Sequence, residues 1–576
     1  MWHKKIHSQW LILLVWIALG LSLRLTNLTA KPPWIDEFAT LVFSLGNSFK
    51  VVPLDRAIAT DVLLQPLQVN PGAGIADVIH TLLTEDIHPP LYFILAHLWM
   101  KLFPSDGGFV SLFAGRSLPA LFGAISIPCV YALGRLAFRS RLVGQLAAAM
   151  MAVSPYGIFM AQEARHYTLV MLWVIASCAC LVIATRHIQN RTQLPLWIGI
   201  SWVVINALGV ATHYFFTLTL CAEAVALILV AWRVQSGGQG GSVASSSLSS
   251  PSPPLPISPS PWYPIYAVAI GTFLVSIVWL PVFLQNKSGG PLTEWIQGSR
   301  QGIAWISPIF QALAAWITMI YLLPVESPNL AIMIASGLVM LVLLIWGAPI
   351  LTRGLKIQLK HSENGLMTQV LAGVVVSAIA LFFIFTYFLG IDLTRGARYN
   401  FVYFPIAIVL VGASLAVCRK TPYVGFTKIS GKKAVEIILS LGFVSAITVV
   451  SNLGYQKYYR PDLFLPVIQQ NSQSPVLIAT THKTLAQTGE MMGLAREFKT
   501  QNSTPPLFFL AHQDKNSQTS TTTLQNTLKE LPRPLDLWLV NFHAPIPEEV
   551  KNCVTQTKSL PAINGYEYKL YHCRKN

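Results

Sequence analysis

The sequence predicts a polytopic α-helical membrane protein with a small C-terminal α/β domain. Of its 576 residues, 53% are hydrophobic and only 11% are charged, whereas soluble domains carry about 25% charged residues. Apolar runs long enough to cross a bilayer recur throughout the first 451 residues. After residue 451, short apolar segments alternate with polar helical ones, which is typical of an α/β domain.

The basic residues indicate how the chain is oriented in the membrane. The formal net charge is +16, but much of the lysine and arginine falls in short loops between apolar runs, where such residues set orientation. The positive charge therefore does not indicate a nucleic-acid partner. Lys4 and Lys5 precede the first apolar run, and no small-residue cleavage site follows it. We expect a retained helix whose N-terminus is cytoplasmic.

We expect 11 to 13 membrane spans in total. The predicted spans are residues 8–24, 114–137, 142–160, 166–185, 196–211, 213–232, 263–284, 329–351, 367–391, 399–418 and 434–451. Residues 91–103 and 304–323 are also apolar, but a full crossing by either would place basic loops on the wrong side. We expect short interfacial or re-entrant helices at both places.

Composition divides the chain into four parts. Residues 1–234 form an N-terminal membrane module that includes a long first extracytoplasmic loop, 25–88. Residues 235–261 are a flexible Gly/Ser/Pro linker on the cytoplasmic side. Residues 262–451 form a second membrane block, and residues 452–576 an extracytoplasmic α/β domain.

Two of these parts carry predicted secondary structure outside the membrane. In the first loop, 50–60 and 74–84 are expected to be short amphipathic helices at the interface. The C-terminal domain is predicted to contain strands 476–480, 507–510, 535–540 and 566–571, with helices 482–499, 520–530 and 547–557. Cys553 and Cys573 are candidates for a disulfide if this domain lies outside the cytoplasm.

Asp36 and Glu37 place two adjacent carboxylates where the first helix should leave the bilayer. A carboxylate pair at a membrane face is costly unless it is solvated or used. Taken alone, the segment is better explained as an interfacial anchor in which Trp34 joins the aromatic belt and the two acids are simply solvated. The other polar positions on the same predicted face favour a functional role.

Several polar residues from distant parts of the chain are predicted to meet on that face. Each one alone could be an ordinary interfacial or structural residue. Arg165, His166 and Arg398 suit an anionic phosphate, because a guanidinium matches phosphate oxygens in a bidentate fork. The full set of further candidates is His88, Gln162, Glu163, Arg165, His166, His213, Tyr214, Arg398 and Tyr399.

This combination of groups fits a transfer reaction at the membrane face. A sugar linked to a polyprenyl phosphate is a membrane-soluble donor, and its phosphate leaves as an anion. The enzyme needs a base for the acceptor hydroxyl and cations for the leaving phosphate. The sequence contains neither a P-loop nor a Rossmann glycine motif, so no nucleotide-sugar site is predicted.

The order of the motifs resembles that of the family 39 glycosyltransferases, which include protein O-mannosyltransferases and bacterial aminoarabinose transferases acting on lipid A. The resemblance covers roughly residues 8–230 and rests on these segments, in order: WIDE, HPPLYFILAHLWMKLF, GRSLPALFGAISIPCVYALGRLAF, SPYGIFMAQEARHYTL and THYF. The C-terminal half lacks the domains of the eukaryotic O-mannosyltransferases. The bacterial branch is therefore the better match.

The resemblance implies a type C glycosyltransferase fold, a polyprenyl-phosphate sugar donor and inversion at the anomeric carbon. It makes Asp36 the catalytic base or acceptor-orienting acid and Glu37 its partner. It places His88 near the donor, Glu163 and Arg165 in the matching second loop, and Arg398 with Tyr399 at a late phosphate-binding arginine. The residues themselves add His166 as a candidate for phosphate binding, with Gln162, His213 and Tyr214 as further site candidates. A divalent metal ion, held by Glu37 and His88, is the one cofactor considered.

We therefore predict a membrane glycosyltransferase of the plasma (inner) membrane that works at the extracytoplasmic face. Its partners are the lipid-linked donor, membrane lipids, and a glycolipid, polysaccharide or protein acceptor. One alternative is a transporter or flippase of lipid-linked sugars, which the absence of inverted repeats disfavours. Another is a scaffold that functions through its tail, although the acidic first loop is hard to explain that way.

Overall fold

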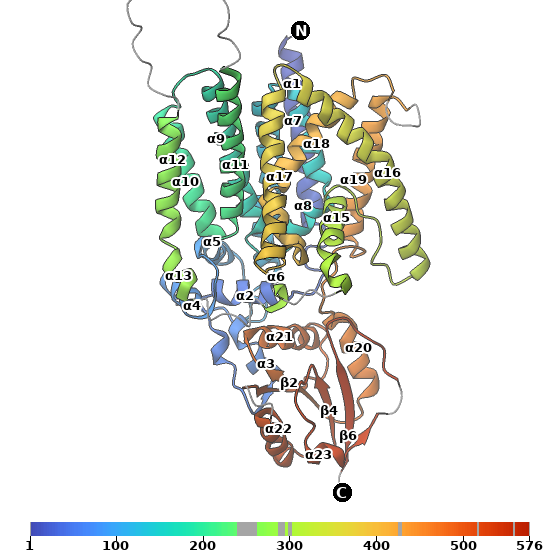
Figure 1. Ribbon diagram of the computed structural model, residues 1–576. Helices are drawn as coiled ribbons and strands as arrows, with labels where there is room; N and C mark the ends of the chain where they lie inside the picture. Colours follow the sequence, from blue (N-terminus) through green and yellow to red (C-terminus); the bar gives the residue numbers. More distant parts are fainter. Residues whose placement is uncertain are drawn as a thin grey trace, which may run out of the picture.

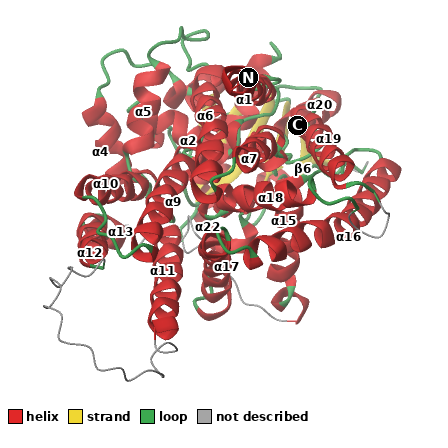
Figure 2. Cartoon of the chain, turned by 90° about the horizontal axis from the view of Figure 1, so that it is seen from above, coloured by secondary structure: helices red, strands yellow, loops and turns green. Residues whose placement is uncertain are grey.

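The computed structural model describes residues 2–238, 262–285, 294–297, 302–423, 429–514, 518–556 and 559–574. A helical body carries an α/β domain at the end opposite the N-terminus, and the first loop lies between the two (Figure 1). Seen from above, the helices form a broad bundle that covers the sheet (Figure 2). Most of the predicted linker 235–261 lies outside the described residues.

Fourteen helices build the described part of the body. They are α1 (Trp2–Leu25), α6 (Leu112–Phe138), α7 (Arg141–Val153), α8 (Pro155–Ala161), α9 (Tyr167–Gln189), α10 (Leu196–Thr212), α11 (Phe216–Gly238), α12 (Tyr263–Ile277), α13 (Leu280–Gln285), α15 (Ser307–Ile320), α16 (Leu330–Lys360), α17 (Gly365–Phe388), α18 (Phe404–Cys418) and α19 (Gly431–Val450). Short 3-10 turns lie in the loops at η5 (Glu294–Ile296), η6 (Gly302–Trp305), η7 (Leu393–Arg395) and η8 (Ala397–Val402).

Five of the described helices are long and apolar enough to span a membrane: α6, α9, α16, α17 and α19. The pair α7 and α8 makes a sixth if it is counted as one span, but it is bent by 58°. This bend corrects the prediction of one continuous span over 142–160. Seven further apolar helical segments have only 10–17 residues, including Gln9–Leu25 within α1 and Phe216–Trp232 within α11. Length and composition therefore identify fewer spans among the described residues than we predicted.

The bend between α7 and α8 follows from the local sequence. Pro155 occupies the first turn of α8, where a missing N–H costs little. The hydroxyl of Ser154 accepts the Gly157 N–H at 3.1 Å and donates to the carbonyl of Met319 in α15 at 2.7 Å. Arg24 of α1 donates to the carbonyl of Met151 at 3.0 Å, near the end of α7. The bend directs α8 toward the loop 162–166.

The first loop is folded throughout. It contains α2 (Ile35–Ser44), η1 (Phe49–Val51), β1 (Ala57–Ala59), α3 (Thr60–Leu63), η2 (Gln65–Leu67) and α4 (Ile75–Glu85), and α5 (Leu91–Met100) follows it. The helix predicted at 74–84 and the short helix predicted at 91–103 are confirmed. The helix predicted at 50–60 is wrong, because this stretch forms β1 and pairs with a strand of the C-terminal domain.

The C-terminal domain consists of a six-stranded sheet with helices on its faces. Its elements are α20 (Pro461–Asn471), β2 (Val476–His482), α21 (Leu485–Thr500), β3 (Leu507–His512), α22 (Gln518–Glu530), β4 (Leu535–Val540), α23 (Glu548–Lys551), β5 (Val554–Thr555) and β6 (Tyr568–Cys573). The strand order is β1-β3-β2-β4-β6-β5. The four predicted strands are confirmed, whereas the helix predicted at 547–557 is a single turn.

Two kinds of pairing hold this sheet together. Strand β2 runs parallel to both β3 and β4, and the other pairs are antiparallel. Ile58 of β1 pairs with Phe508 of β3, which places part of the first loop at one edge of the sheet. At the other end of the sheet, Cys553 and Cys573 form the predicted disulfide.

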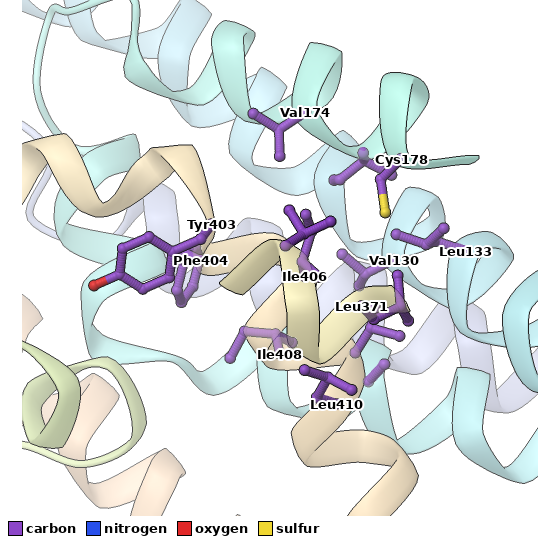
Figure 3. Packing of buried hydrophobic residues seen from close by; sticks show 14 of the residues in the cluster. Val130, Leu133, Val174, Cys178, Leu371, Tyr403, Phe404, Ile406, Ile408 and Leu410 are labelled. Carbon is purple, nitrogen blue, oxygen red and sulfur yellow. The ribbon is translucent and has the colours of Figure 1, made fainter. Parts of the chain in front are cut away.

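The main apolar core lies in the helical body, around α18. Helix α18 contacts α6, α7, α16 and α17, so it is enclosed on most sides. Its residues Phe404, Ile406 and Ile408 pack with Val130 of α6 and Leu371 of α17 (Figure 3). This packing fixes the helix that follows the Arg395–Tyr399 loop, and that loop contributes to the site described next.

Candidate active site

The first turn of α2 carries both predicted carboxylates. Trp34 is the N-cap residue, and its backbone N–H donates to the Glu37 carboxylate at 3.4 Å. Acidic side chains are favoured in this position, because the exposed N–H groups of a helix N-terminus carry partial positive charge. The predicted membrane-exit segment is therefore a helix start that presents Asp36 and Glu37 in different directions.

Glu37 is fully buried and serves as a structural anchor. Arg116 of α6 donates to its two carboxylate oxygens at 2.7 and 2.8 Å, and the Ala164 N–H donates at 2.8 Å. Burial alone would raise the pKa of Glu37, but Arg116, Lys457 and these hydrogen bonds lower it to about 2. We predicted a catalytic partner here. This carboxylate instead joins α2, α6 and the loop 162–166.

Asp36 is the accessible carboxylate of the pair, with 29% of its side chain exposed. Its Oδ2 lies 3.5 Å from Nη2 of Arg398 and 4.0 Å from Nη2 of Arg165. Both distances exceed those of a directed N–H···O hydrogen bond, which is roughly 2.7–3.2 Å long. The two guanidinium groups therefore attract the carboxylate without occupying its oxygens.

Arg165 links the predicted site residues to one another. It donates to the Asp36 carbonyl at 3.0 Å, to the Thr40 hydroxyl at 2.9 Å and to Nε2 of His88 at 3.0 Å. Because arginine can only donate, Nε2 of His88 accepts, and Nδ1 carries the proton that bonds Asp86 at 2.9 Å. Asp86, His88, Arg165 and Asp36 thus form one continuous chain.

Three histidines gather beside this chain. The ring centroid of His166 lies 5.2 Å from that of His88 and 4.6 Å from that of His213. Burial lowers the pKa of His166 and His213 well below the usual value, and the charge of Arg165 lowers both further. Both rings are therefore neutral at pH 7. Neither ring nitrogen of His166 has a hydrogen-bond partner among the described residues.

Arg398 and Tyr399 arrive from the loop before α18. The Arg398 guanidinium lies 4.6 Å from the ring centroid of Trp34 and 4.7 Å from that of Trp295. Aromatic rings at this distance stabilise a cation. The buried ring of Tyr399 packs 4.8 Å from that of Phe215. The late arginine is thus brought to Asp36, although the two residues are far apart in the sequence.

The remaining predicted residues hold the surrounding loops. The Gln162 amide donates to the carbonyls at the end of α1, including that of Thr26 at 2.8 Å. Glu163 is buried and pairs with Lys457. The Tyr214 ring lies 6.3 Å from that of Trp279. For Gln162 this corrects the prediction, because its amide is used to join α1 to the loop 162–166.

Sequence reasoning missed three residues of the site. Arg116 lies within the GRSLP segment that carries the family resemblance, and its position one helical turn into α6 could have indicated a partner for an acid. Lys457 and Trp295 lie in loops far along the chain. No local pattern connects either residue to the first loop.

The residues proposed as metal ligands do not fit a metal ion in this arrangement. Both Glu37 oxygens accept hydrogen bonds from Arg116, and His88 bonds Asp86 and Arg165 with its two ring nitrogens. Among the described residues, no group of three or more His, Cys, Asp and Glu side chains is placed to hold an ion. The metal requirement stays a prediction.

A comparison with family models matches one segment of the chain, and this segment contains most of the polar residues of the candidate site. It matches the family described as dolichyl-phosphate-mannose-protein mannosyltransferase over residues 87–239. This segment is similar to that family over about a quarter of the chain. It contains His88, Glu163, Arg165, His166 and His213, whereas Asp36 and Arg398 lie outside it. The match agrees with the predicted resemblance to the protein O-mannosyltransferases over this segment.

Comparison with solved structures finds similar arrangements at low identity. ArnT from Cupriavidus metallidurans in the apo state has 9% identity and a TM-score of 0.48, with 98% of each chain covered. The same protein bound to undecaprenyl phosphate has 10% identity and a TM-score of 0.47, with 97% of each covered. AglB from Archaeoglobus fulgidus, in complex with an inhibitory peptide and a dolichol-phosphate, has 11% identity and a TM-score of 0.46.

The alignment with AglB covers 94% of this chain and 70% of that one. Among curated proteins no match is found. The helical membrane fold with its C-terminal α/β domain therefore rests on the elements described above and on the family match. No finding supports the alternative of a flippase.

Proposed function

We propose that this protein transfers a sugar from a polyprenyl-phosphate-linked donor to an acceptor hydroxyl at the extracytoplasmic face of the plasma (inner) membrane, with inversion at the anomeric carbon. The observation that carries the proposal is the position of Asp36. It is an accessible carboxylate held near the partly buried guanidinium of Arg398 at 3.5 Å and the buried guanidinium of Arg165 at 4.0 Å. The name of the matched family describes a donor of the same class.

The proposed reaction is a single displacement. Asp36 accepts the proton of the acceptor hydroxyl, and the hydroxyl oxygen attacks the anomeric carbon of the sugar. The bond between that carbon and the phosphate oxygen breaks, and its electron pair leaves with the phosphate. Arg165 and Arg398 stabilise the departing anion, because both remain charged and lie on the same side of Asp36.

The histidines contribute hydrogen bonding in this proposal. Because Arg165 occupies Nε2 of His88 and the pKa of His166 is well below neutral, neither ring supplies a fixed positive charge by itself. His166 has two free ring nitrogens in the described part of the chain. One of them can donate to a phosphate or sugar oxygen, which orients the donor without adding charge.

Two observations support the proposed orientation. The first loop and the C-terminal domain lie at the same end of the body, opposite the N-terminus (Figure 1). The disulfide between Cys553 and Cys573 belongs to an oxidising compartment. Both observations agree with an orientation in which the N-terminus is cytoplasmic and the C-terminal domain is extracytoplasmic.

The proposal is tested by sugar transfer in detergent with a panel of polyprenyl-phosphate sugars. Release of polyprenyl phosphate is measured for the wild type, for Asp36→Asn and for Asp106→Asn, a matched control at an exposed loop position. We expect turnover in the wild type and the control, and a loss of roughly 10²-fold or more in Asp36→Asn. Equal turnover in all three proteins would remove Asp36 as the base. Lipid flipping without any transfer would favour the transporter.

A further inference from the structure

Lys457 is a buried lysine at the start of the C-terminal domain. It lies between α19 and α20, and only 6% of its side chain is exposed. Its ammonium group pairs with Oε1 of Glu163 and lies 3.7 Å from Oε2 of Glu37. A residue outside the matched family segment thus supplies positive charge to two buried carboxylates of the site.

Lys457 also contacts the aromatic residue that precedes the catalytic acid. Its Nζ lies 5.2 Å from the ring centroid of Trp34, and the Arg398 guanidinium lies 4.6 Å from the same centroid. Both distances are within cation–π range. The indole of Trp34 is therefore placed by two cations, one from the C-terminal domain junction and one from the site.

The carboxylate of Glu163 depends on this lysine. Glu163 is 2% exposed, and its second oxygen has no hydrogen-bond partner among the described residues. A buried charge that loses its partner is strongly destabilising. Removing Lys457 alone therefore perturbs folding as well as the position of the Trp34 indole. A variant that tests the effect on that position must remove the charge of Glu163 at the same time.

The C-terminal domain contacts the catalytic helix at a second place. Helix α21 packs on α2, and two of its glycines lie at this contact, where an added Cβ would make ordinary van der Waals contact. A Cβ on Gly489 would lie 3.4 Å from Ile35, and one on Gly493 would lie 3.6 Å from Phe38. The domain that carries Lys457 therefore also supports the helix that carries Asp36.

We propose that Lys457 is a positioning residue of the active site, which acts through Trp34 on Arg398 and thereby sets where the donor phosphate binds relative to Asp36. The inference rests on the proposed function. Lys457 does not contact the reacting atoms. Its charge fixes Glu163, its ammonium group fixes the indole of Trp34, and the indole fixes the guanidinium that receives the phosphate.

The test uses the full-length protein and undecaprenyl phosphate as the probe. The variants are Lys457→Arg, which keeps charge and cation–π contact, and the pair Lys457→Met with Glu163→Gln, which removes both charges together. The matched control is Lys529→Met with Glu549→Gln, because this pair is a more exposed ion pair of the same domain, at 3.2 Å, with side chains 57% and 21% exposed. Thermal unfolding with and without the probe reports both folding and binding.

We expect the double variant at Lys457 and Glu163 to fold and to bind the probe about tenfold more weakly, with the donor KM raised more than kcat is lowered. Lys457→Arg and the control should bind the probe like the wild type. If the folded double variant binds the probe with wild-type affinity, the role of Lys457 is overturned and the proposed function is not affected. A wild type that neither binds the probe nor transfers sugar would overturn the proposed function and this inference with it.

Discussion

Arg116 and Glu37 form a buried pair with two parallel hydrogen bonds, from Nε to Oε1 at 2.7 Å and from Nη2 to Oε2 at 2.8 Å. Arg116 also donates to the carbonyls of Leu28 and Lys31 at 2.9 Å each. The Arg116 guanidinium therefore binds the chain segment between α1 and α2 as well as the first turn of α2. The pair holds the loop that carries Asp36, whose own carboxylate stays accessible.

We predict that Arg116→Met destabilises the protein by about 3–5 kcal/mol, because the buried Glu37 carboxylate loses both guanidinium hydrogen bonds and keeps only the Lys457 ammonium group at 3.7 Å as a charged partner. The measurement is thermal unfolding in detergent. Arg135→Met, at an exposed position near the end of the same helix, serves as the control and should unfold like the wild type. A small effect at Arg116 would mean that Glu37 is not ionised.

The acid stability of the protein should depend on Glu37. Its pKa is about 2 in the folded protein and 4.5 ordinarily, so the ionised form stabilises the fold by about 3 kcal/mol. This contribution is complete above pH 4.5 and is lost as the pH falls toward 2. Glu37→Gln should abolish the dependence in this window, measured by unfolding at a series of pH values. Glu363→Gln, an exposed control, should retain it.

Glu490 should give the opposite dependence in the C-terminal domain. Burial raises the pKa of this carboxyl to about 8, despite hydrogen bonds to Asn541 and Tyr459. Because the folded protein holds the proton more tightly, the stability of the domain should fall as the pH rises from 4.5 to 8. Glu490→Gln should remove this loss, so that hydrogen exchange of β4 becomes independent of pH in that range after correction for intrinsic rates.

The donor affinity should depend on the shape of the Arg398 side chain. Lysine keeps the charge, but it lacks the planar group that lies between Trp34 and Trp295. We predict that Arg398→Lys raises the donor KM about tenfold, with a smaller change in kcat. Steady-state kinetics with a polyprenyl-phosphate sugar measures this. Arg419→Lys is the control, at an exposed position beyond α18, and should leave KM unchanged.

The disulfide should stabilise the C-terminal domain and report its compartment. Cys553 and Cys573 enclose a loop with a sequence separation of 20 residues, for which a loss of about 3 kcal/mol on removal is expected. Changing both to serine should increase hydrogen exchange in β6, whereas Cys221→Ser should not. In intact cells, a membrane-impermeant reagent should label these cysteines only after reduction. Labelling without reduction would contradict the pairing.

Local sequence patterns predicted those elements of the fold that are formed by consecutive residues. The membrane helices follow from apolar runs, and Leu535–Val540 appears as a strand with the predicted bounds. The helix predicted at 50–60 is wrong for a physical reason. Its three-residue strand is too short to be stable alone and depends on pairing with β3. Such pairing leaves no local signal.

The site shows the same division. Asp36, His88, Arg165 and Arg398 were predicted, because polar groups at a membrane face are unusual enough to be noticed. The family resemblance assigned the base to Asp36, but the local sequence gives no physical reason why Asp36, and not Glu37, stays accessible. That choice depends on Arg116, whose guanidinium enters the structure from a helix about 80 residues away and takes both oxygens of Glu37.

The pairing of β1 with β3 determines when the site can form during synthesis. The hydroxyl of Thr60, directly after β1, bonds the carbonyl of Pro506 across 446 residues of chain. Ribosomes make this part of the first loop long before its partner strand exists, so the loop must wait for almost the whole polypeptide. A chain that stops before residue 507 carries every predicted site residue and still lacks the strand that holds their loop.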